Sequence, residues 1–268
     1  MHGFLSRDGF PPGDLLELGR EEVAGYGGQI VDAAVERVER DRSSFQVRLD
    51  SGLSVSARRL VIATGLHDEL PEIPGLRERW ARDVLHCPYC HGFEVRDQVL
   101  GVLGWAPGAA TYAQIVRQWS NDVVYFASGT TLTASEREEL EARSVTVIDG
   151  TVERVVIEDD QLRGLELDDK RVIELGALFV PPRFVPNNDL LVELGCDLDQ
   201  NGWATTDATG RTSVAGVWVA GNVTNPRAQV ITAAGEGSAV ATALNADLVA
   251  EDVALAVHAA SGAHSKDT

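Results

Sequence analysis

An internal repeat constrains the fold of this chain more strongly than any other feature of its sequence. Residues 30–38 read Ile-Val-Asp-Ala-Ala-Val-Glu-Arg-Val, and residues 147–155 read Val-Ile-Asp-Gly-Thr-Val-Glu-Arg-Val, at an offset of 147 − 30 = 117. Chance can match five residues of nine, but it rarely reproduces the flanking pattern as well. We therefore expect two related folding units.

The same flanking elements accompany both copies. An acidic amphipathic stretch of helix formers precedes each copy, at residues 14–25 and 133–143, and the second stretch opens with the capping box Thr133-x-x-Glu136. Short alternating segments with polar turns follow each copy and predict a β-meander. Each copy then closes with an apolar strand, at residues 60–63 and 178–180.

The second copy indicates which unit is repeated. An apolar strand at residues 99–103 is followed by the turn Gly104-Trp105-Ala106-Pro107-Gly108, a helix at 110–119 and a strand at 123–126. This order is typical of the dinucleotide-binding unit, in which a helix N-terminus and a close backbone approach receive a pyrophosphate. A purely structural strand–helix turn is the alternative. The prediction is an α/β fold with two Rossmann-like dinucleotide-binding domains, the second inserted in the first, each with a β-meander.

The first copy lacks the equivalent glycine turn. The closing strands are offset by 178 − 60 = 118, so the counterpart of Gly104 falls at 104 − 118 = −14, before Met1. A genuine truncation, a fragment and a start codon placed too far downstream are three explanations that the sequence leaves open.

Two of only three cysteines lie in Cys87-Pro88-Tyr89-Cys90-His91. A Cys-x-x-Cys pair closes a small reducible ring, in which one thiol attacks a partner's disulfide and the other resolves it, and the motif lowers the pKa of one thiol. The imidazole that follows can give or take a proton near neutral pH. We interpret the motif as a redox dithiol with Cys87, Cys90 and His91 as catalytic residues.

Three other interpretations of the motif are haem attachment, a zinc site and a structural disulfide. Cys-x-x-Cys-His also marks covalent haem attachment, but the only methionine is Met1, so a methionine axial ligand is lacking. Zinc could use His86 and the motif as one knuckle, but Cys196 stands alone and the other histidines are scattered. A structural disulfide does not suit a reducing compartment.

Composition excludes several classes of partner. The formal net charge of −18 disfavours nucleic acid and anionic membranes, because both would repel the chain. No apolar run is long enough to cross a membrane, and the first residues, Met-His-Gly-Phe-Leu-Ser-Arg-Asp, do not form a secretory signal. A cytoplasmic protein without a metal site is the expectation.

Taken in order, the motifs resemble the low-molecular-weight thioredoxin reductase family, within the FAD-dependent pyridine nucleotide-disulfide oxidoreductases and dithiol oxidases. The resemblance is carried by Leu60-Val61-Ile62-Ala63-Thr64-Gly65, Pro71-x-x-Pro74-Gly75, Cys87–His91, the segment 216–223 and the segment 227–237. The order and spacing together are far more specific than any one motif.

The resemblance implies roles for particular residues. An apolar strand ends at Ala220-Gly221, and the N-terminus of the helix predicted at 230–248 faces the flavin pyrimidine ring in this family. A tightly packed core helix is the alternative for that segment. Cys90 would lie beside the flavin, Cys87 would meet the external substrate and His91 would move the proton. FAD contacts are implied for Thr64, Gly65, Gly221, Asn222, Arg227, Gln229, Val230 and Ala233, and contacts to the nicotinamide nucleotide for Gly104 and Gly108.

Three departures from the family pattern bear on the chemistry. His91 replaces the aspartate that the reductases place after the second cysteine, as in some dithiol oxidases. Asn222 replaces the aspartate of the second flavin motif. Ala106 replaces a glycine of the turn, and residues 125–130 contain no basic side chain for the 2′-phosphate of NADPH. Use of NAD(P)H is therefore the open question, whereas FAD is the expected cofactor.

The predicted domains are an N-terminally incomplete FAD-type domain, residues 1–83 and 184–268, and an NAD(P)-type domain, residues 84–183, that carries the dithiol. Three functional hypotheses follow: a disulfide reductase of thioredoxin reductase type, a dithiol oxidase that passes electrons to oxygen, and a truncated non-enzymatic paralogue that binds no FAD. Expected partners are a thioredoxin-like protein or a small dithiol or disulfide, and a second copy in a homodimer. Cys196 is expected to be a buried small hydrophobe.

Overall fold

The computed structural model describes residues 1–41 and 44–264. The last four residues of the predicted FAD-type domain, 265–268, lie outside the described part. The chain divides into two compact units: unit 1 contains Met1–Leu15 and Asp68–Arg183, and unit 2 contains Leu16–His67 and Phe184–Thr268. It passes between the units within helix α1 (Pro12–Gly25), within strand β5 (Leu66–Glu69) and in strand β14 (Arg183–Pro186).

Unit 1 is built around a parallel sheet of five strands. The strand order is β6-β13-β7-β8-β9, and every neighbouring pair is parallel. Such sheets are buried on both faces, and accordingly all four residues of β7 and all four of β8 are buried. The strands are β6 (Val84–Leu85), β7 (Leu100–Leu103), β8 (Val123–Phe126), β9 (Val145–Ile148) and β13 (Ala177–Phe179).

Short helices connect these strands. Helix α3 (Ala109–Val116) runs between β7 and β8, so the predicted order of strand, glycine turn, helix and strand is confirmed. Helix α4 (Ala134–Ala142) begins at the predicted capping box, in which the Thr133 Oγ1 accepts a hydrogen bond from the Glu136 amide at 3.2 Å. The remaining elements are η1 (Arg77–Arg79) and α2 (Pro88–His91).

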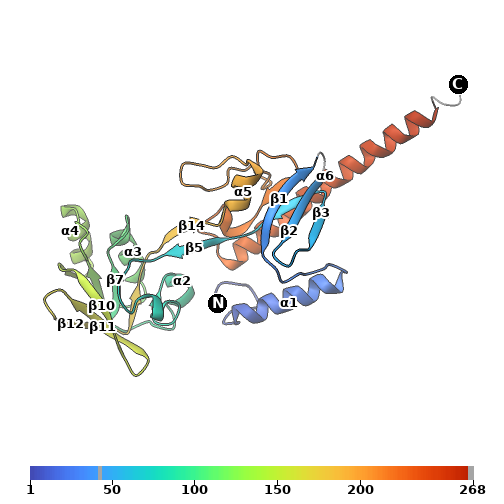
Figure 1. The fold of residues 1–268 in the computed structure, drawn as a ribbon. Coiled ribbons are helices and arrows are strands. Elements are labelled where there is room, and N and C mark those ends of the chain that lie inside the picture. The colour runs from blue at the N-terminus through green and yellow to red at the C-terminus, as the bar shows by residue number, and fades with distance from the viewer. Residues whose placement is uncertain (42–43, 265–268) are drawn as a thin grey trace. The chain divides into compact units, whose positions relative to one another are not determined.

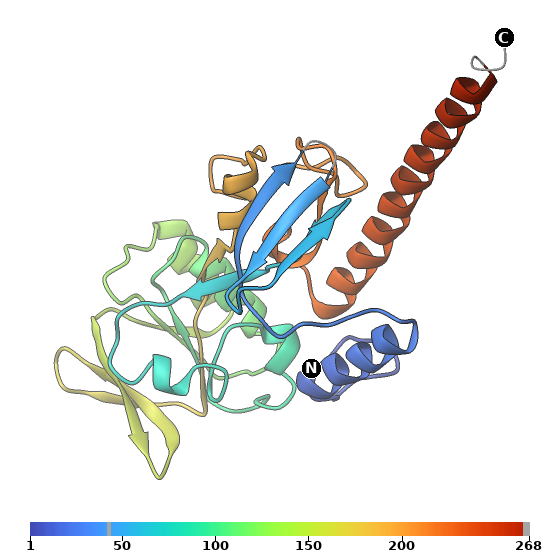
Figure 2. The same cartoon turned by 45° about the vertical axis from the view of Figure 1, so that its right-hand side comes forward.

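The predicted repeat appears as two three-stranded antiparallel meanders, one in each unit. In unit 2 it consists of β1 (Val35–Asp41), β2 (Ser44–Leu49) and β3 (Ser54–Ala57), which Figure 2 shows as three adjacent blue arrows. In unit 1 it consists of β10 (Val152–Glu158), β11 (Gln161–Leu167) and β12 (Val172–Glu174).

The two meanders match in register as well as in strand order. Val35 pairs with Leu49 and Val152 pairs with Leu167, and in each strand pair a bulge follows at once, before Arg37 and before Arg154. A bulge twists and bends its strand at a fixed point. The repeat therefore preserves an irregularity of the backbone, which confirms that it is structural.

Unit 2 also contains a parallel pair, β4 (Leu60–Ile62) and β15 (Val217–Val219). Helix α5 (Asp189–Leu194), the short turn η2 (Gly221–Val223) and helix α6 (Val230–His264) complete it. Helix α6 continues well past the predicted end at residue 248, because its alanine-rich sequence contains no proline (Figure 1). Among the described residues, no helix is both long and apolar enough to span a membrane.

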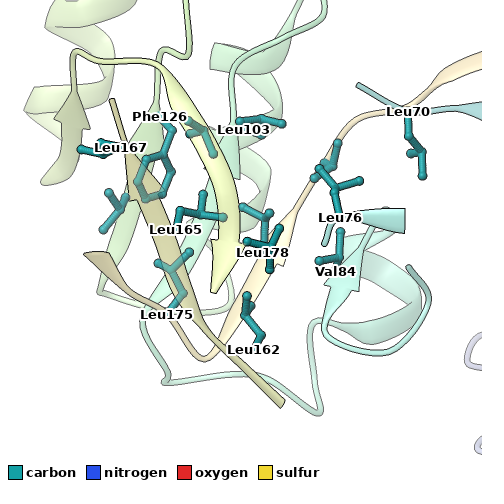
Figure 3. Close-up of a cluster of buried hydrophobic side chains, with 14 residues drawn as sticks. Leu70, Leu76, Val84, Leu103, Phe126, Leu162, Leu165, Leu167, Leu175 and Leu178 are labelled. Carbon is teal, nitrogen blue, oxygen red and sulfur yellow. The ribbon is translucent and has the colours of Figure 1, made fainter. Parts of the chain in front are cut away.

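Each unit has its own apolar core. In unit 1, one cluster of buried side chains lies between the parallel sheet and the meander, and Figure 3 shows Phe126, Leu165 and Leu178 at its centre. A second cluster covers the other side of the sheet, beneath α3 and α4. In unit 2 the core includes Phe45, Leu191 and Val217. The α/β fold class is thus confirmed.

Candidate functional site

The dithiol lies where β6 ends and α2 begins, in unit 1. Cys87 is the residue before the helix, and the amides of Cys90 and His91 both donate to its carbonyl oxygen at 3.1 Å. Pro88 at the first helical position fixes the backbone direction without losing a needed N–H. Both thiols are free and half-buried. This turn brings together the three predicted catalytic residues, Cys87, Cys90 and His91.

The two thiols have opposite acid–base character. The Cys87 thiolate accepts a hydrogen bond from the Cys90 thiol and further bonds from the backbone amides of Cys90 and Tyr89, which lowers the pKa of Cys87 to about 7. The hydrogen bond to Cys87 and burial raise the pKa of Cys90 above its usual value. Because the thiolate is the nucleophilic form, Cys87 is the more nucleophilic of the two thiols near neutral pH.

Two histidines flank the dithiol, His86 before it and His91 after it. Burial lowers the pKa of His91, and burial also lowers the pKa of His86. Both imidazoles are therefore neutral at pH 7, so His91 can accept a proton from a neighbouring thiol.

Helix α3 holds the dithiol turn in place. The Tyr112 hydroxyl donates to the carbonyl of His86, one residue before Cys87. Gly92, at the end of α2, packs so closely that a Cβ there would lie 2.6 Å from the Trp119 ring and 2.4 Å from the Pro88 carbonyl oxygen. Sequence reasoning missed Tyr112 and Trp119, and the only signal for them was the glycine directly after the motif.

The glycine turn between β7 and α3 has the expected form, and its first glycine packs closely against β8. A Cβ at Gly104 would lie 2.3 Å from the Tyr125 hydroxyl oxygen, so only glycine fits. The Thr130 Oγ1 lies 2.9 Å from the Gly104 carbonyl oxygen and 2.6 Å from the Ala127 carbonyl oxygen, so its single proton has two acceptors within reach. Gly108 precedes the helix with a φ of 82°, a conformation that favours glycine.

The predicted flavin-binding residues belong to unit 2, at one edge of the parallel pair. Because β4 and β15 are parallel, Thr64 and Gly65 follow one carboxyl end and Gly221 follows its neighbour. This is the edge at which open α/β sheets bind ligands. Thr64 is hydrogen-bonded to Asn187 in both directions, through its Oγ1 at 2.6 Å and its carbonyl at 2.9 Å.

The loop from Gly221 to α6 is closed by its own side chains. Gly221 has a φ of 76°, and its amide donates to the Glu236 carboxylate at 2.8 Å. Asn222 donates to the carbonyls of Asn225 and Ala228, each at 3.0 Å. The Asn222 amide thus orders the loop before α6, a task that does not require the charge of an aspartate.

The start of α6 suits a flat apolar ring with polar edges. Val230 and Ile231 are 43% and 42% exposed, and the first backbone N–H groups of a helix have no acceptor within it. Gly221 leaves the approach open, since a Cβ there would meet only Ala233, at 3.6 Å. Gln229 and Arg227 are exposed beside this surface. These residues fit the flavin ring of FAD.

Two further sequence-based expectations concern cysteine and metal. Cys196 is buried, 3.5 Å from the Thr212 hydroxyl, and burial raises the pKa of its thiol, so it is a core residue as predicted. Within residues 1–41 and 44–264, no group of three or more His, Cys, Asp and Glu side chains could hold a metal ion.

Comparison with known proteins gives consistent results. Residues 13–237 match the family described as pyridine nucleotide-disulphide oxidoreductase. Thioredoxin reductase aclD of Aspergillus oryzae is 28% identical over 75% of this chain and 68% of its own length. Thioredoxin reductase sirT of Leptosphaeria maculans is 26% identical over 85% of this chain and 76% of its own length. A probable thioredoxin reductase of Arthroderma benhamiae is 31% identical over 48% of this chain, a stretch that spans only 34% of that relative.

Solved structures resemble the whole chain. HlmI is 56% identical, with a TM-score of 0.94 over 97% of this chain and 83% of its own. An oxidoreductase from Agrobacterium tumefaciens is 32% identical, with a TM-score of 0.86 over 92% of this chain and 84% of its own.

Proposed function

Since the chain belongs to the pyridine nucleotide-disulphide oxidoreductase family, we propose that it exchanges electrons between the Cys87–Cys90 pair and an external thiol or disulfide. Enzymes of the thioredoxin reductase-like group act on sulfur and are FAD-dependent, with NAD(P)H as electron donor. The observation that carries the proposal is the pair of free thiols at the start of α2, where the hydrogen bond from Cys90 lowers the pKa of Cys87 to about 7.

The dithiol chemistry follows from this inequality. The Cys87 thiolate attacks one sulfur of an external disulfide, and a mixed disulfide forms as the other substrate sulfur leaves as a thiolate. Cys90 then gives its proton to His91 and attacks the Cys87 sulfur, which closes the Cys87–Cys90 disulfide and releases the reduced substrate. Two electrons pass from the dithiol to the substrate, and the reverse sequence oxidises a substrate dithiol.

FAD, when bound, supplies the two-electron donor or acceptor that restores the dithiol. The residues proposed to hold it in unit 2 are Thr64, Gly65, Gly221, Asn222, Arg227, Gln229, Val230 and Ala233. The free amides at the start of α6 would supply hydrogen-bond donors to the ring, and the exposed Val230 and Ile231 would supply apolar contact. Residues 1–83 with 184–268 are proposed as the FAD-type domain, and residues 84–183 as the nicotinamide-type domain.

Two directions of electron flow are compatible with the dithiol. A reductase would take electrons from a nicotinamide held by Gly104 and Gly108, whereas an oxidase would pass them to oxygen. The alanine at 106 and the absence of a basic residue from 125 to 130 favour the oxidase. We propose a thioredoxin-like protein or a small dithiol as substrate, a homodimer as the assembly and the cytoplasm as the location.

The test uses FAD-loaded protein with two substrates. Oxidation of dithiothreitol in air measures the oxidase, and NADPH-driven reduction of an aromatic disulfide measures the reductase. Cys87→Ser and Cys90→Ser should each abolish both activities, whereas Cys196→Ser, in the core of unit 2, should retain them. Undiminished thiol–disulfide turnover in both motif variants would refute the proposal.

A further inference from the structure

The first ten residues form a closed turn within unit 1. The Met1 amino group donates to the Phe10 carbonyl at 3.1 Å, and the Gly9 amide donates to the Met1 carbonyl at 2.9 Å. The Gly3 amide donates to one oxygen of the Asp8 carboxylate at 3.0 Å. These bonds fix the backbone on both sides of His2, so the position of its imidazole is built by the turn.

His2 bridges two carboxylates. Its Nδ1 lies 3.0 Å from Asp8 Oδ2, and its Nε2 lies 2.5 Å from Glu94 Oε1. Only the doubly protonated imidazole can donate at both nitrogens. The hydrogen bonds with Glu94 and Asp8 accordingly raise the pKa of His2.

Glu94 follows the dithiol closely, four residues after Cys90 and three after His91. Partial burial raises the pKa of Glu94, but the hydrogen bond from His2, a backbone N–H bond and the charges of His2 and His91 together hold that pKa below its usual value. The charge of Glu94 acts on both neighbours, since it raises the pKa of His91 and that of Cys90. The charged groups that act on the pKa of His91 are Glu94, which raises it, and the Met1 amino group and His2 of the N-terminal turn, which lower it directly. His91 in turn lowers the pKa of His86.

We propose that His2 is a positioning residue for the dithiol, which acts through Glu94: its imidazolium, held by Asp8, fixes the Glu94 side chain and neutralises its charge beside His91. The inference deepens the proposed function and rests on it for the role of His91 as proton acceptor. Nothing else in it depends on flavin or on turnover.

The physical consequence concerns the proton that Cys90 must lose. With the bridge intact, the Glu94 charge is compensated and His91 stays neutral, ready to accept that proton. Without His2, the free carboxylate favours the imidazolium form of His91 and disfavours the Cys90 thiolate. His91 would then titrate closer to neutral pH, and a smaller fraction of it would be in the neutral form that accepts the proton of Cys90.

The test is a titration of His91 by NMR in the full reduced chain, with 13C-labelled histidine, in His2→Gln, Glu94→Gln and the double variant. His2→Gln should raise the pKa of His91 by about half a unit, the size expected of one nearby, partly screened charge. In the Glu94→Gln background the same His2 substitution should shift it by much less. His258→Gln, which removes an exposed histidine of α6, is the matched control and should shift nothing.

Two results would overturn the inference. One is an unchanged pKa of His91 in His2→Gln. The other is an equal shift with and without Glu94, which would mean that His2 only repels His91 directly. A loss of folding in His2→Gln would appear as a general change in the histidine spectrum, and the conservative His2→Lys, which can still donate to Glu94, should then restore the His91 pKa. Failure of that rescue in a folded His2→Lys also counts against the inference. The NMR titrations do not require enzyme turnover, so they test the role of His2 even if the proposed function is wrong.

Discussion

At the scale of single residues, the main determinant of reactivity is the contact between the two thiols. The hydrogen bond from Cys90 is the largest cause of the lowered pKa of Cys87, ahead of the backbone amides of the turn. In the proposed mechanism Cys90 therefore has two tasks, because it resolves the mixed disulfide and its hydrogen bond also favours the thiolate form of Cys87.

This contact predicts the pH dependence of alkylation. In Cys90→Ala, Cys87 loses its strongest hydrogen bond, and the midpoint of its reaction with iodoacetamide should move from about 7 toward the value of a free thiol, about 8.5. Mass spectrometry of the alkylated peptide across a pH series measures the midpoint. Cys87→Ala is the reciprocal control, in which Cys90 should react slowly at pH 7. An unmoved midpoint in Cys90→Ala would contradict the assignment.

A second prediction at this scale concerns Gly92. Its φ of −62° suits any residue, so the need for glycine comes from the close approach of Pro88 and Trp119 alone. Gly92→Ala should lower the free energy of unfolding by about 1–3 kcal/mol, the usual cost of overpacking. Gly237→Ala, in the helix interior of α6 with nothing near its Cβ position, should instead raise it by about 0.5–1 kcal/mol. Urea unfolding followed by circular dichroism measures the free energy of unfolding of both variants. An equal change in Gly92→Ala and Gly237→Ala would refute the packing argument.

At the scale of elements, short sequence patterns predicted the helices, turns and strands that depend on residues close together in the chain. The repeat anticipated both meanders, and Thr133-x-x-Glu136 anticipated the first turn of α4, because a capping box is made by residues three apart. The same holds for the dithiol and for the glycine turn, whose residues are close in sequence. The register bulges before Arg37 and Arg154 lie inside the repeat but leave no local signal.

The support of the dithiol could not be predicted in this way. Tyr112 reaches the His86 carbonyl across 26 residues, and His2 reaches Glu94 across 92. No periodicity relates such positions, because they meet only after the parallel sheet and the N-terminal turn have formed. Sequence reasoning therefore identified the candidate reactive groups but missed the residues that contact them from distant parts of the sequence.

The helix cap gives a prediction for an element. Thr133→Ala removes the acceptor for the Glu136 amide and should lower the free energy of unfolding by about 1 kcal/mol. Ser135→Ala, two residues further on, removes only an exposed side-chain hydrogen bond to Glu139 and should change it by less than about 0.5 kcal/mol. Urea denaturation of both variants provides the comparison. A larger loss in Ser135→Ala would show that the capping box does not determine the helix start.

At the scale of the whole molecule, the described apolar clusters respect the division into units. The two clusters around the parallel sheet contain only residues of unit 1, and the two around β4 and β15 contain only residues of unit 2. Since burial of apolar area is the main favourable term in folding, each unit carries its own source of stability. We therefore expect two separable unfolding transitions.

Arg79 is the residue best placed to test this. It is 4% exposed and donates to Asp83 through two nitrogens, at 2.8 and 2.5 Å, and to Asp160 at 2.8 Å. Asp83 in turn accepts from the Leu162 amide at 2.9 Å, so the network joins the segment before β6 to the meander within unit 1. Removing the guanidinium would leave the partly buried Asp83 carboxylate without its cation. The loss of one partner of a buried ion pair lowers the free energy of unfolding by about 3 kcal/mol.

Arg79→Met should therefore lower the unfolding temperature of unit 1 in calorimetry and leave that of unit 2 unchanged. Arg82→Met, which changes a side chain that is 52% exposed, should change neither temperature by much.

The loss of stability in Arg79→Met should also depend on pH. Burial raises the pKa of Asp83, but the hydrogen bonds and charge of Arg79, together with backbone N–H bonds from Leu162 and Asp83 itself, bring that pKa below its usual value. Without Arg79, the pKa of Asp83 should be higher in the folded variant than in its unfolded chain, so protonation in acid stabilises the folded variant. The difference in free energy of unfolding between the variant and the original protein should therefore shrink from pH 7 to pH 4. A single transition that moves as a whole would refute the independence of the two cores, and a deficit that grows in acid would refute the assignment of the network.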